Sequence, residues 1–339
     1  MRIWHSRYQL RARHAFNSRS DGKIREGALL RVRFADGAVG FADLCPFPDM
    51  GDRPLDIELR HLAADRPLAL AARSLHFARL DATARAQRVS LYDRFARIEN
   101  HFLISDLTRF DAERLDEIAA CGYRRYKIKI GRDLAVESER LETFVDRLVQ
   151  AEHSTSPDEK LRIRLDFNAT PSRDRFAQWL DTNLTHLLPV LEFIEDPFPY
   201  DARQWSDVGS QWPVSLALDM AADPVASGGE GAAVIVVKPA VQEVAPIVKV
   251  FAGTDKRFVF THYMDSPVGQ MCALVVTQQV FHEVHAQTLV CGLQHHDAWE
   301  ASEFQGAIES DGPFIVPPQG CGLGFDGLLE RRVWTELAP

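Results

Sequence analysis

The chain has 339 residues, of which 46% are hydrophobic, and carries a formal net charge of -9 at pH 7. This apolar content is enough for a large buried core and excludes a disordered chain. The negative charge argues against a nucleic-acid-binding protein, because such proteins present clustered Lys and Arg to the phosphate backbone.

The amino-terminal residues 1–98 are predicted to form an α+β domain. In the segment GALLRVRFADGAVGFADL (27–44), apolar and polar residues alternate around Asp36-Gly37, which indicates a β-hairpin. Residues 56–85 carry apolar side chains at helical spacing, interrupted near Pro67. We expect the carboxyl-terminal segment, about 310–339, to join this domain.

Residues 99–309 show a different pattern, in which short apolar runs alternate with longer amphipathic stretches. This pattern is typical of repeated βα units and a parallel sheet, and eight such runs fit a (β/α)8-type TIM barrel. The runs are HFLISD (101–106), RYKIKIG (125–131), LRIRLDFN (161–168), LEFIEDP (191–197), VSLALDM (214–220), AVIVVKP (233–239), RFVFTHY (257–263) and a weaker QTLVCGL (287–293).

Charged residues stand at the ends of five successive predicted strands. They are Lys127 and Lys129 on the second strand, Asp166 on the third, Glu195 on the fourth, Asp219 on the fifth and Lys238 on the sixth. A closed barrel gathers these strand ends in one site, which an open doubly wound sheet does not. Taken alone, Lys127 and Lys129 also fit an edge strand with Lys facing solvent. The whole set favours an active site.

The three acids predict a divalent metal ion. Carboxylates that converge at a barrel mouth repel one another, and a cation among them relieves that repulsion. All-oxygen ligands favour Mg²⁺, and Mn²⁺ could substitute. We expect Asn168 to hydrogen-bond a ligand rather than to bind the ion. Singly, each acid could instead be a helix cap or a salt-bridge partner.

The lysines predict proton-transfer chemistry. Lys129 and Lys238 would approach the metal from opposite sides, and a lysine beside a metal ion and a second ammonium has a lowered pKa. A neutral amine can then act as a base on a carboxylate substrate, which loses an α-proton and forms an enediolate. Lys238 precedes Pro239 and could also simply extend from a strand end toward solvent.

These motifs together resemble the enolase superfamily, in its muconate lactonising subgroup. YKIKIG is similar to the K-x-K strand of that subgroup, LDFN to its D-x-N, EDP to its E-[ED]-P and VVKP to its sixth-strand lysine, while VGFADLCPFP resembles a capping-domain motif. THYMDSPVGQMCAL and CGLQHHDAWE most resemble the seventh and eighth strands of the o-succinylbenzoate synthases. The resemblance implies a modified (β/α)7β barrel with an α+β cap.

The resemblance also implies a reaction, namely dehydration of 2-succinyl-6-hydroxy-2,4-cyclohexadiene-1-carboxylate to o-succinylbenzoate in menaquinone synthesis. Lys129 would remove the α-proton and pass it to the departing hydroxyl, Lys238 would steady the enediolate from the opposite face, and Lys127 would tune its neighbour. The implied metal ligands are Asp166, Glu195 and Asp219. The expected substrate contacts are Ser266, His262 and Gly292, with Arg19 or Arg25 from a polar loop at 16–27.

Three residues depart from the family pattern: Met220 and Asp43 each replace a Glu, and His295 replaces a Thr. They leave other functions open, because N-acylamino acid racemases, dipeptide epimerases and muconate cycloisomerases share the same motifs. A mandelate racemase-like reaction would pair His262 with a sixth-strand Asp, but Lys238 holds that position. A catalytically silent metal-binding barrel is the alternative outside enzymes.

The remaining predictions concern location and partners. The chain shows neither an apolar run of about 18 residues nor a secretory signal at its start, so a cytoplasmic location is expected. The five cysteines are scattered without a CxxC pair, which favours reduced, mostly buried thiols. We expect a small-molecule carboxylate as the partner, no nucleic acid or membrane, and either a monomer or a homo-oligomer.

Overall fold

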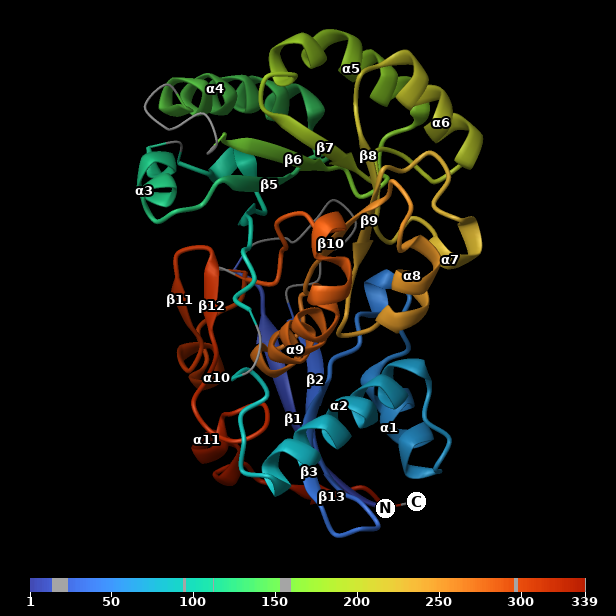
Figure 1. Cartoon of the computed structure of the whole chain (residues 1–339), viewed down its shortest axis with the longest axis vertical. Coiled ribbons are helices and arrows are strands. Elements are labelled where there is room, and N and C mark those ends of the chain that lie inside the picture. Colours follow the sequence, from blue (N-terminus) through green and yellow to red (C-terminus); the bar gives the residue numbers. More distant parts are fainter. Residues whose placement is uncertain (14–23, 94–95, 112, 153–159, 296–297, 339) are drawn as a thin grey trace.

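A computed structural model describes residues 1–13, 24–93, 96–111, 113–152, 160–295 and 298–338 (Figure 1). A smaller cap carries both chain termini, and a larger barrel contains the middle of the chain. The expected capped TIM barrel is confirmed in these two units. The boundaries at residues 98/99 and 309/310 stay predictions.

The cap is built on a four-stranded antiparallel sheet in the order β13-β1-β2-β3. Because β13 comes from the far end of the chain, the sheet joins the two termini. Two helices, α1 and α2, accompany the sheet (Figure 1). The bounds are β1 Arg2–Arg11, β2 Ile24–Arg33, β3 Val39–Leu44, α1 Leu55–Ala63, α2 Ala69–Ala86 and β13 Thr335–Glu336.

Two glycines shape the cap, and the sequence predicts the turn at the first of them. The hairpin between β2 and β3 turns at Gly37, whose φ of 83° suits glycine. Gly40 lets α2 lie directly on β3, because a Cβ atom there would stand 1.9 Å from the carbonyl oxygen of Ala78. The helical pattern is interrupted between Ala63 and Ala69, around the predicted break at Pro67.

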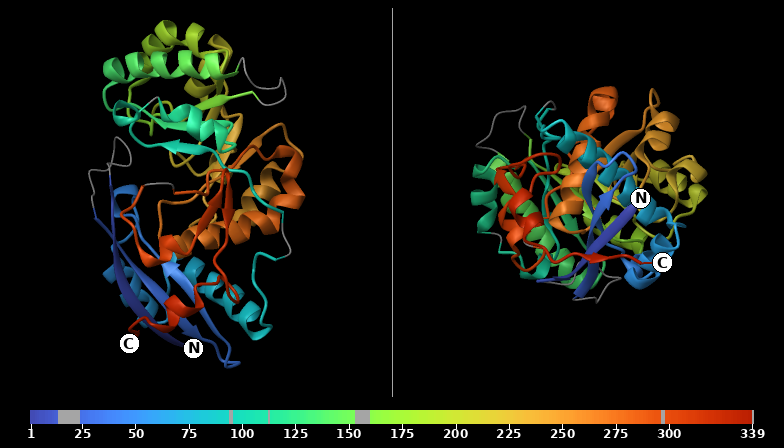
Figure 2. Two further views of the ribbon diagram at one scale, coloured as in Figure 1. Left: turned by 90° about the vertical axis from the view of Figure 1, so that its left-hand side faces the viewer. Right: turned by 90° about the horizontal axis from the view of Figure 1, so that it is seen from below.

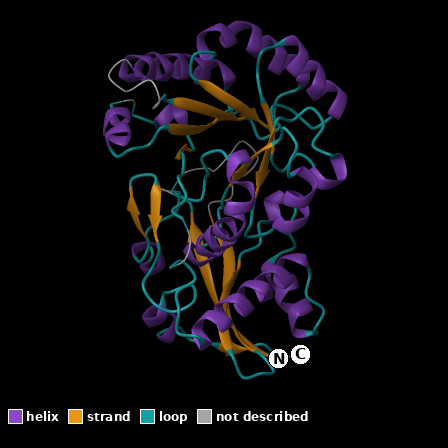
Figure 3. Cartoon of the chain, viewed as in Figure 1, coloured by secondary structure: helices purple, strands orange, loops and turns teal. Residues whose placement is uncertain are grey.

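The barrel is a curled parallel sheet in the order β10-β9-β8-β7-β6-β5-β4, with helices around its outside (Figures 2 and 3). Its strands are β4 Phe102–Ile104, β5 Arg125–Lys129, β6 Arg162–Asp166, β7 Leu191–Glu195, β8 Leu216–Leu218, β9 Val234–Val237 and β10 Arg257–Phe260. Its helices are α3 Arg114–Ala120, α4 Leu134–Glu152, α5 Arg173–Leu187, α6 Ala202–Gln211, α7 Pro224–Ser227, α8 Val244–Phe251 and α9 Pro267–Val284. The chain then adds α10 Glu303–Gly306, β11 Glu309–Asp311, β12 Phe314–Val316 and α11 Asp326–Glu330.

The weak eighth run closes the barrel without forming a regular strand. Thr288 makes a parallel bridge to Phe258 of β10, and Gly292 makes one to Thr261, just after β10. Cys291 makes a parallel bridge to Asn100, just before β4. The segment at 288–292 therefore links the two edges of the seven-stranded sheet, as an eighth strand would. Closure brings the carboxyl ends of all the strands to one mouth.

Successive side chains along each barrel strand point alternately outward, toward the helices, and inward. Ile128 on β5 is fully buried in the main core, and Lys127 and Lys129 point the other way, into the barrel. The inner face below the active site is filled by a separate apolar cluster, Phe193, Ala217, Val234, Val236 and Val259. Since β5 pairs with β4 and β6, the edge-strand interpretation of the two lysines is wrong.

Arg25 on β2 fastens the cap to the barrel. Its guanidinium donates to the carbonyl oxygens of Tyr263 and Met264 in the barrel, both at 2.7 Å, and to those of Cys45 and Pro46 in the cap. The side chain is buried between the rings of Phe47 and Tyr263. One cation thus satisfies four carbonyl groups at the junction.

Replacing Arg25 by methionine is expected to lower the free energy of unfolding by about 2–4 kcal/mol, because buried carbonyl groups lose their donor. Urea denaturation followed by circular dichroism measures this change. Arg33→Met, on an exposed position of the same strand, is the matched control and should change stability by less than about 0.5 kcal/mol. Equal stability of the two variants would contradict the role of Arg25 in joining the cap to the barrel.

All five cysteines are unpaired, and Cys45, Cys272 and Cys291 are buried, as predicted, whereas Cys121 is exposed. Within the described ranges, none of the helices has the length and apolar character that a membrane span needs.

Candidate active site

The predicted strand-end residues meet at the mouth of the barrel. Lys129, Asp166 and Glu195 lie side by side in register on β5, β6 and β7. A pocket at this mouth is covered by Phe47 and Met50 of the cap. Its barrel lining includes Lys127, Lys129, Asp166, Asn168, Asp219, Lys238, Thr261, His262 and Gly292.

Two lysines pair with the three acids. Lys127 Nζ lies 2.6 Å from Glu195 Oε1 and 3.1 Å from Asp166 Oδ2. Lys238 Nζ lies 2.7 Å from Asp219 and donates to the hydroxyl of Thr261 at 3.3 Å. These contacts engage Lys127 and Lys238 with carboxylates. Among the residues that the structure describes, none forms an ion pair with Lys129.

The electrostatics separate the roles of these groups. Burial lowers the pKa of Lys129 to about 8, with Lys127 and Lys238 adding to the effect against the opposing charge of Asp166. Lys127 is also buried, but Asp166 and Glu195 raise its pKa. Lys129 is therefore the lysine that can lose its proton near neutral pH, and Lys127 stays charged.

The acids form a strongly repelling group. Burial and the neighbouring charge of Asp166 raise the pKa of Glu195 to about 8. Burial opposes ionisation of Asp166, but Lys127 and Lys129 outweigh it and lower its pKa. Such different pKa values are expected where buried carboxylates share one site, and additional positive charge would relieve the repulsion between the carboxylates.

The donor set fits a divalent cation by ligand type, since all three groups offer carboxylate oxygens. Their spacing is wider than that of a tight metal cluster. In the described part of the chain, three ligating side chains bring atoms within 4.8 Å of one another at His262, Asp265 and His295, not at the three acids. The ammonium groups of Lys127 and Lys238 occupy contacts of the acids instead, so metal ligation stays a prediction.

Residues around the acids hold them in place. Asn168 donates from its amide to Asp166 Oδ1 at 2.8 Å and from its backbone N–H at 3.1 Å. Asp196 accepts the backbone N–H of Asp219 at 3.0 Å and that of Met220 at 3.2 Å. The sequence interpretation overlooked Asp196, although an acid directly after Glu195 in EDP is the signal that could have shown it.

Buried polar groups below the site were also overlooked. Arg164 is fully buried on the inner face of β6 and donates to Glu192, to the carbonyl of Val290 and to Nδ1 of His101, which reaches the pocket. Arg164 stands two residues before Asp166, so strand alternation alone predicts that it shares the inner face.

Only some of the expected substrate contacts line the pocket. His262 and Gly292 line the pocket, and a Cβ atom on Gly292 would stand 2.3 Å from the ring of His101. Ser266 is the N-cap of α9, where it accepts the N–H groups of Val268 and Gly269. Arg25 is buried and hydrogen-bonded to carbonyl groups of both cap and barrel, so the structure gives it a role other than substrate contact. Arg19 lies outside the described residues.

The departures from the family pattern are also placed. Met220 packs in an apolar cluster between cap and barrel. Asp43 accepts from the hydroxyl of Tyr8 at 2.5 Å, and burial together with nearby Asp265 raises its pKa to about 7. His295 is buried beside Asp265.

Comparisons with known proteins agree on the family. Residues 3–84 match the family model described as the O-succinylbenzoate synthase N-terminal domain, and residues 111–330 match the enolase C-terminal domain-like family. An o-succinylbenzoate synthase of Bdellovibrio bacteriovorus is 32% identical over 340 residues, covering 99% of both chains.

Solved structures share the fold at low identity. N-succinyl Arg/Lys racemase from Bacillus cereus superposes with a TM-score of 0.76 at 16% identity, covering 99% of each chain. The L-Ala-D/L-Glu epimerase from Bacillus subtilis gives a TM-score of 0.75 at 16% identity, covering 96% of this chain and 98% of the other. At such identities the likeness concerns the fold alone.

Proposed function

The chain belongs to the o-succinylbenzoate synthase family of the enolase superfamily, and on this premise we propose that it dehydrates 2-succinyl-6-hydroxy-2,4-cyclohexadiene-1-carboxylate to o-succinylbenzoate. The observation that carries the proposal is a pocket in which Lys129 has a lowered pKa and Lys238 comes from a strand across the barrel. A spectrophotometric assay of the cyclohexadiene substrate with Mg²⁺ tests it. Absence of turnover would overturn it.

The proposal includes a bound Mg²⁺, or Mn²⁺, held by Asp166, Glu195 and Asp219. The fit is supported by the oxygen ligands and by the raised pKa of Glu195, because a cation among buried carboxylates would relieve the repulsion from Asp166 that contributes to this shift. When bound, such an ion supplies Lewis acidity that makes the α-proton of a carboxylate substrate easier to remove. Asn168 and Asp196 keep Asp166 and Asp219 oriented through hydrogen bonds.

The lysines carry the proton transfer. Neutral Lys129 accepts the α-proton of the substrate on Nζ, while negative charge develops on the substrate carboxyl group. Lys238 contacts Asp219 and Thr261 and faces that charge from the opposite wall. The substrate hydroxyl then leaves as water after taking the proton back from Lys129, which restores the neutral amine and balances the reaction.

The value of kcat/KM is expected to rise with pH up to about 8, because Lys129 must be neutral and burial lowers its pKa to about 8. A divalent ion nearby would lower that pKa further, so the rise is complete at or below this value. Initial rates between about pH 5 and pH 9 at saturating Mg²⁺ measure the profile. A profile that falls over the same range would exclude Lys129 as the base.

Racemisation of N-acylamino acids is a second candidate function, since lysines on opposite walls can exchange a proton with either face of an α-carbon. It is tested by incubating N-succinylamino acids with the protein in D₂O. Exchange of the α-proton with loss of optical activity supports this function. If the protein dehydrates the cyclohexadiene substrate but exchanges no α-proton of the N-succinylamino acids, the dehydratase function alone is supported.

A further inference from the structure

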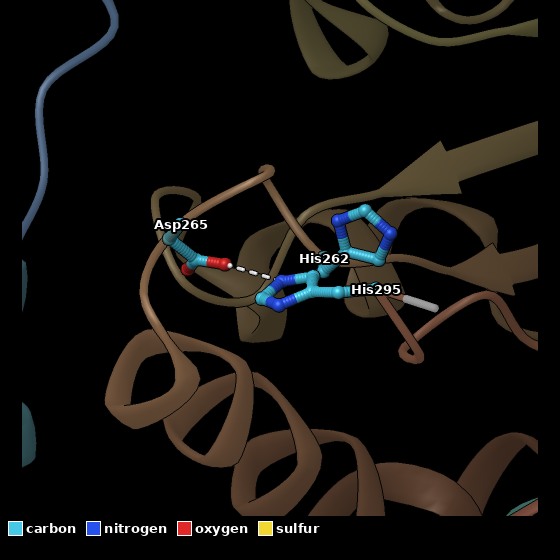
Figure 4. A group of neighbouring side chains, drawn as sticks. All are labelled: His262, Asp265 and His295. Atoms are coloured by element: carbon cyan, nitrogen blue, oxygen red, sulfur yellow. Dashed lines mark ion pairs between the residues drawn. The ribbon is translucent and has the colours of Figure 1, made fainter. Parts of the chain in front are cut away.

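Two arginines of the cap donate hydrogen bonds to main-chain carbonyl groups at the mouth of the barrel. Arg25 of β2 holds the loop after β10, on which Figure 4 shows His262 and Asp265. Arg73 of α2 holds the turn that follows β9 in the same way. Both segments begin at the carboxyl end of a barrel strand, where the active site of such a barrel lies. The cap therefore holds parts of the active site in addition to covering it.

The side chain of Arg73 is directed at a single carbonyl oxygen. Its Nε and Nη2 atoms donate to the carbonyl oxygen of Pro239 at 3.1 and 2.9 Å. The guanidinium also lies over the ring of Phe77, with its central carbon 4.5 Å from the ring centroid. Phe77 is buried and lines a small cavity together with Ala240 and Val241 of the turn. A planar group with two donors restrains the direction of the carbonyl as well as its distance.

The turn connects Arg73 to Lys238, which directly precedes Pro239. The proline ring fixes its own φ and limits the backbone of the lysine before it. The carbonyl oxygen of Lys238 accepts the N–H groups of Val241 and Gln242 at 3.0 and 2.9 Å. The backbone N–H of Lys238 donates to Oε1 of Gln242 at 2.7 Å. This turn is thus a short, stiff link between the cap arginine and the active-site lysine.

The reactive end of Lys238 is sensitive to the position of its backbone. Nζ lies 2.7 Å from Asp219 and 3.3 Å from the hydroxyl of Thr261. The side chain is buried, so its neighbours leave little room for another rotamer. A backbone shift of about 1 Å would therefore move Nζ as well, and misplacement on that scale can cost about a hundredfold in rate.

We propose that Arg73 is a positioning residue for Lys238, through which docking of the cap sets the second lysine of the active site. The proposal rests on the proposed function, in which Lys238 faces the negative charge that develops on the substrate. Arg73 is not among the described residues that line the pocket, so it acts through the turn and not on the substrate. Because that charge develops in the transition state, loss of Arg73 affects kcat more than KM.

Arg73→Met is expected to lower kcat by about fivefold to fiftyfold and to change KM by less than about threefold. Methionine keeps an apolar side chain over Phe77 but donates no hydrogen bond. Arg73→Lys, which keeps the charge but lacks the two-donor fork, should recover part of kcat. Arg79→Met is the matched control, because Arg79 lies on the same helix over Phe34 and pairs with Asp36 inside the cap. It should keep wild-type kinetics.

A double-mutant cycle separates positioning of Lys238 from a general loss of stability. In a Lys238→Ala background, Arg73→Met should change kcat by less than about twofold, because the side chain that Arg73 positions is gone. A role in stability alone would reduce kcat by the same factor in both backgrounds. The residual activity of Lys238→Ala is measured at high enzyme concentration. If Arg73→Met does not fold, Arg73→Lys takes its place in the cycle.

Amide hydrogen exchange gives a measurement that needs no turnover. The N–H groups of Val241 and Gln242 should exchange at least about tenfold faster in Arg73→Met than in the wild type, because the turn loses its contact with the cap. Arg79→Met should exchange these groups at the wild-type rate.

Three results would overturn the inference. They are wild-type kcat in a folded Arg73→Met variant, an equal loss of kcat with and without the Lys238 side chain, and unchanged amide exchange in the turn. Failure of the proposed function is distinguishable, because it leaves the wild type itself without turnover of the cyclohexadiene substrate, whereas the exchange experiment still reports on the turn.

Discussion

Replacing Lys129 by alanine is expected to lower kcat by about 10³-fold or more, because in the proposed reaction the side chain both removes the α-proton and returns it to the leaving hydroxyl. Lys127 and Lys238 are not expected to substitute, since each is engaged with carboxylates. The fold should persist, because the variant loses a buried ammonium that burial already disfavours. Stopped assays with the cyclohexadiene substrate measure the loss.

The matched control for Lys129→Ala is Lys249→Ala, on an exposed position of α8, which should keep wild-type activity. Circular dichroism and metal titration of Lys129→Ala should resemble those of the wild type. Activity within about tenfold of the wild type would show that another group takes the proton, and the assignment of Lys129 would be wrong.

Replacing Glu195 by glutamine is expected to reduce activity by at least about 10²-fold, because Glu195 is a ligand of the proposed metal ion. The folded chain should tolerate the change, because Glu195 has a pKa of about 8 and Gln resembles its protonated form. The amide oxygen of Gln can still accept the hydrogen bond from Lys127, which Glu195 now receives at 2.6 Å. Steady-state kinetics over a range of Mg²⁺ concentrations measure the effect.

The kinetic pattern of Glu195→Gln discriminates a metal ligand from a structural acid. A weakened ligand raises the Mg²⁺ concentration needed for half-maximal activity, and excess Mg²⁺ recovers part of the rate. Loss of activity that no Mg²⁺ concentration alters, combined with a lower melting temperature, would instead mean that Glu195 serves only to pair with Lys127.

Much of the site could be predicted from the sequence, because the spacing of residues along a barrel strand determines which face of the sheet their side chains occupy. Lys127, Lys129 and Asp166 alternate with apolar residues, so a strand directs them to one face, and closure of the barrel turns that face inward. The sequence alone could not decide between an inner face and an exposed edge. The pairing of β5 with two neighbours decides it.

The parts that sequence reasoning misplaced depend on contacts between distant segments. Arg25 seemed free to meet a substrate because it belongs to a polar loop, yet its partners Tyr263 and Met264 lie more than two hundred positions away along the chain. His262 and His295 likewise come together only when the last segment closes the barrel. No local pattern encodes such pairings.

The central claim is that acids from three neighbouring strands bind one divalent ion next to Lys129. Titration of the purified chain with Mn²⁺, followed by electron paramagnetic resonance, tests it most directly. The account predicts one Mn²⁺ per chain, displaced by Mg²⁺, retained in Lys129→Ala and weakened in Glu195→Gln. Failure to bind Mn²⁺, or binding that Glu195→Gln leaves unchanged, would contradict it.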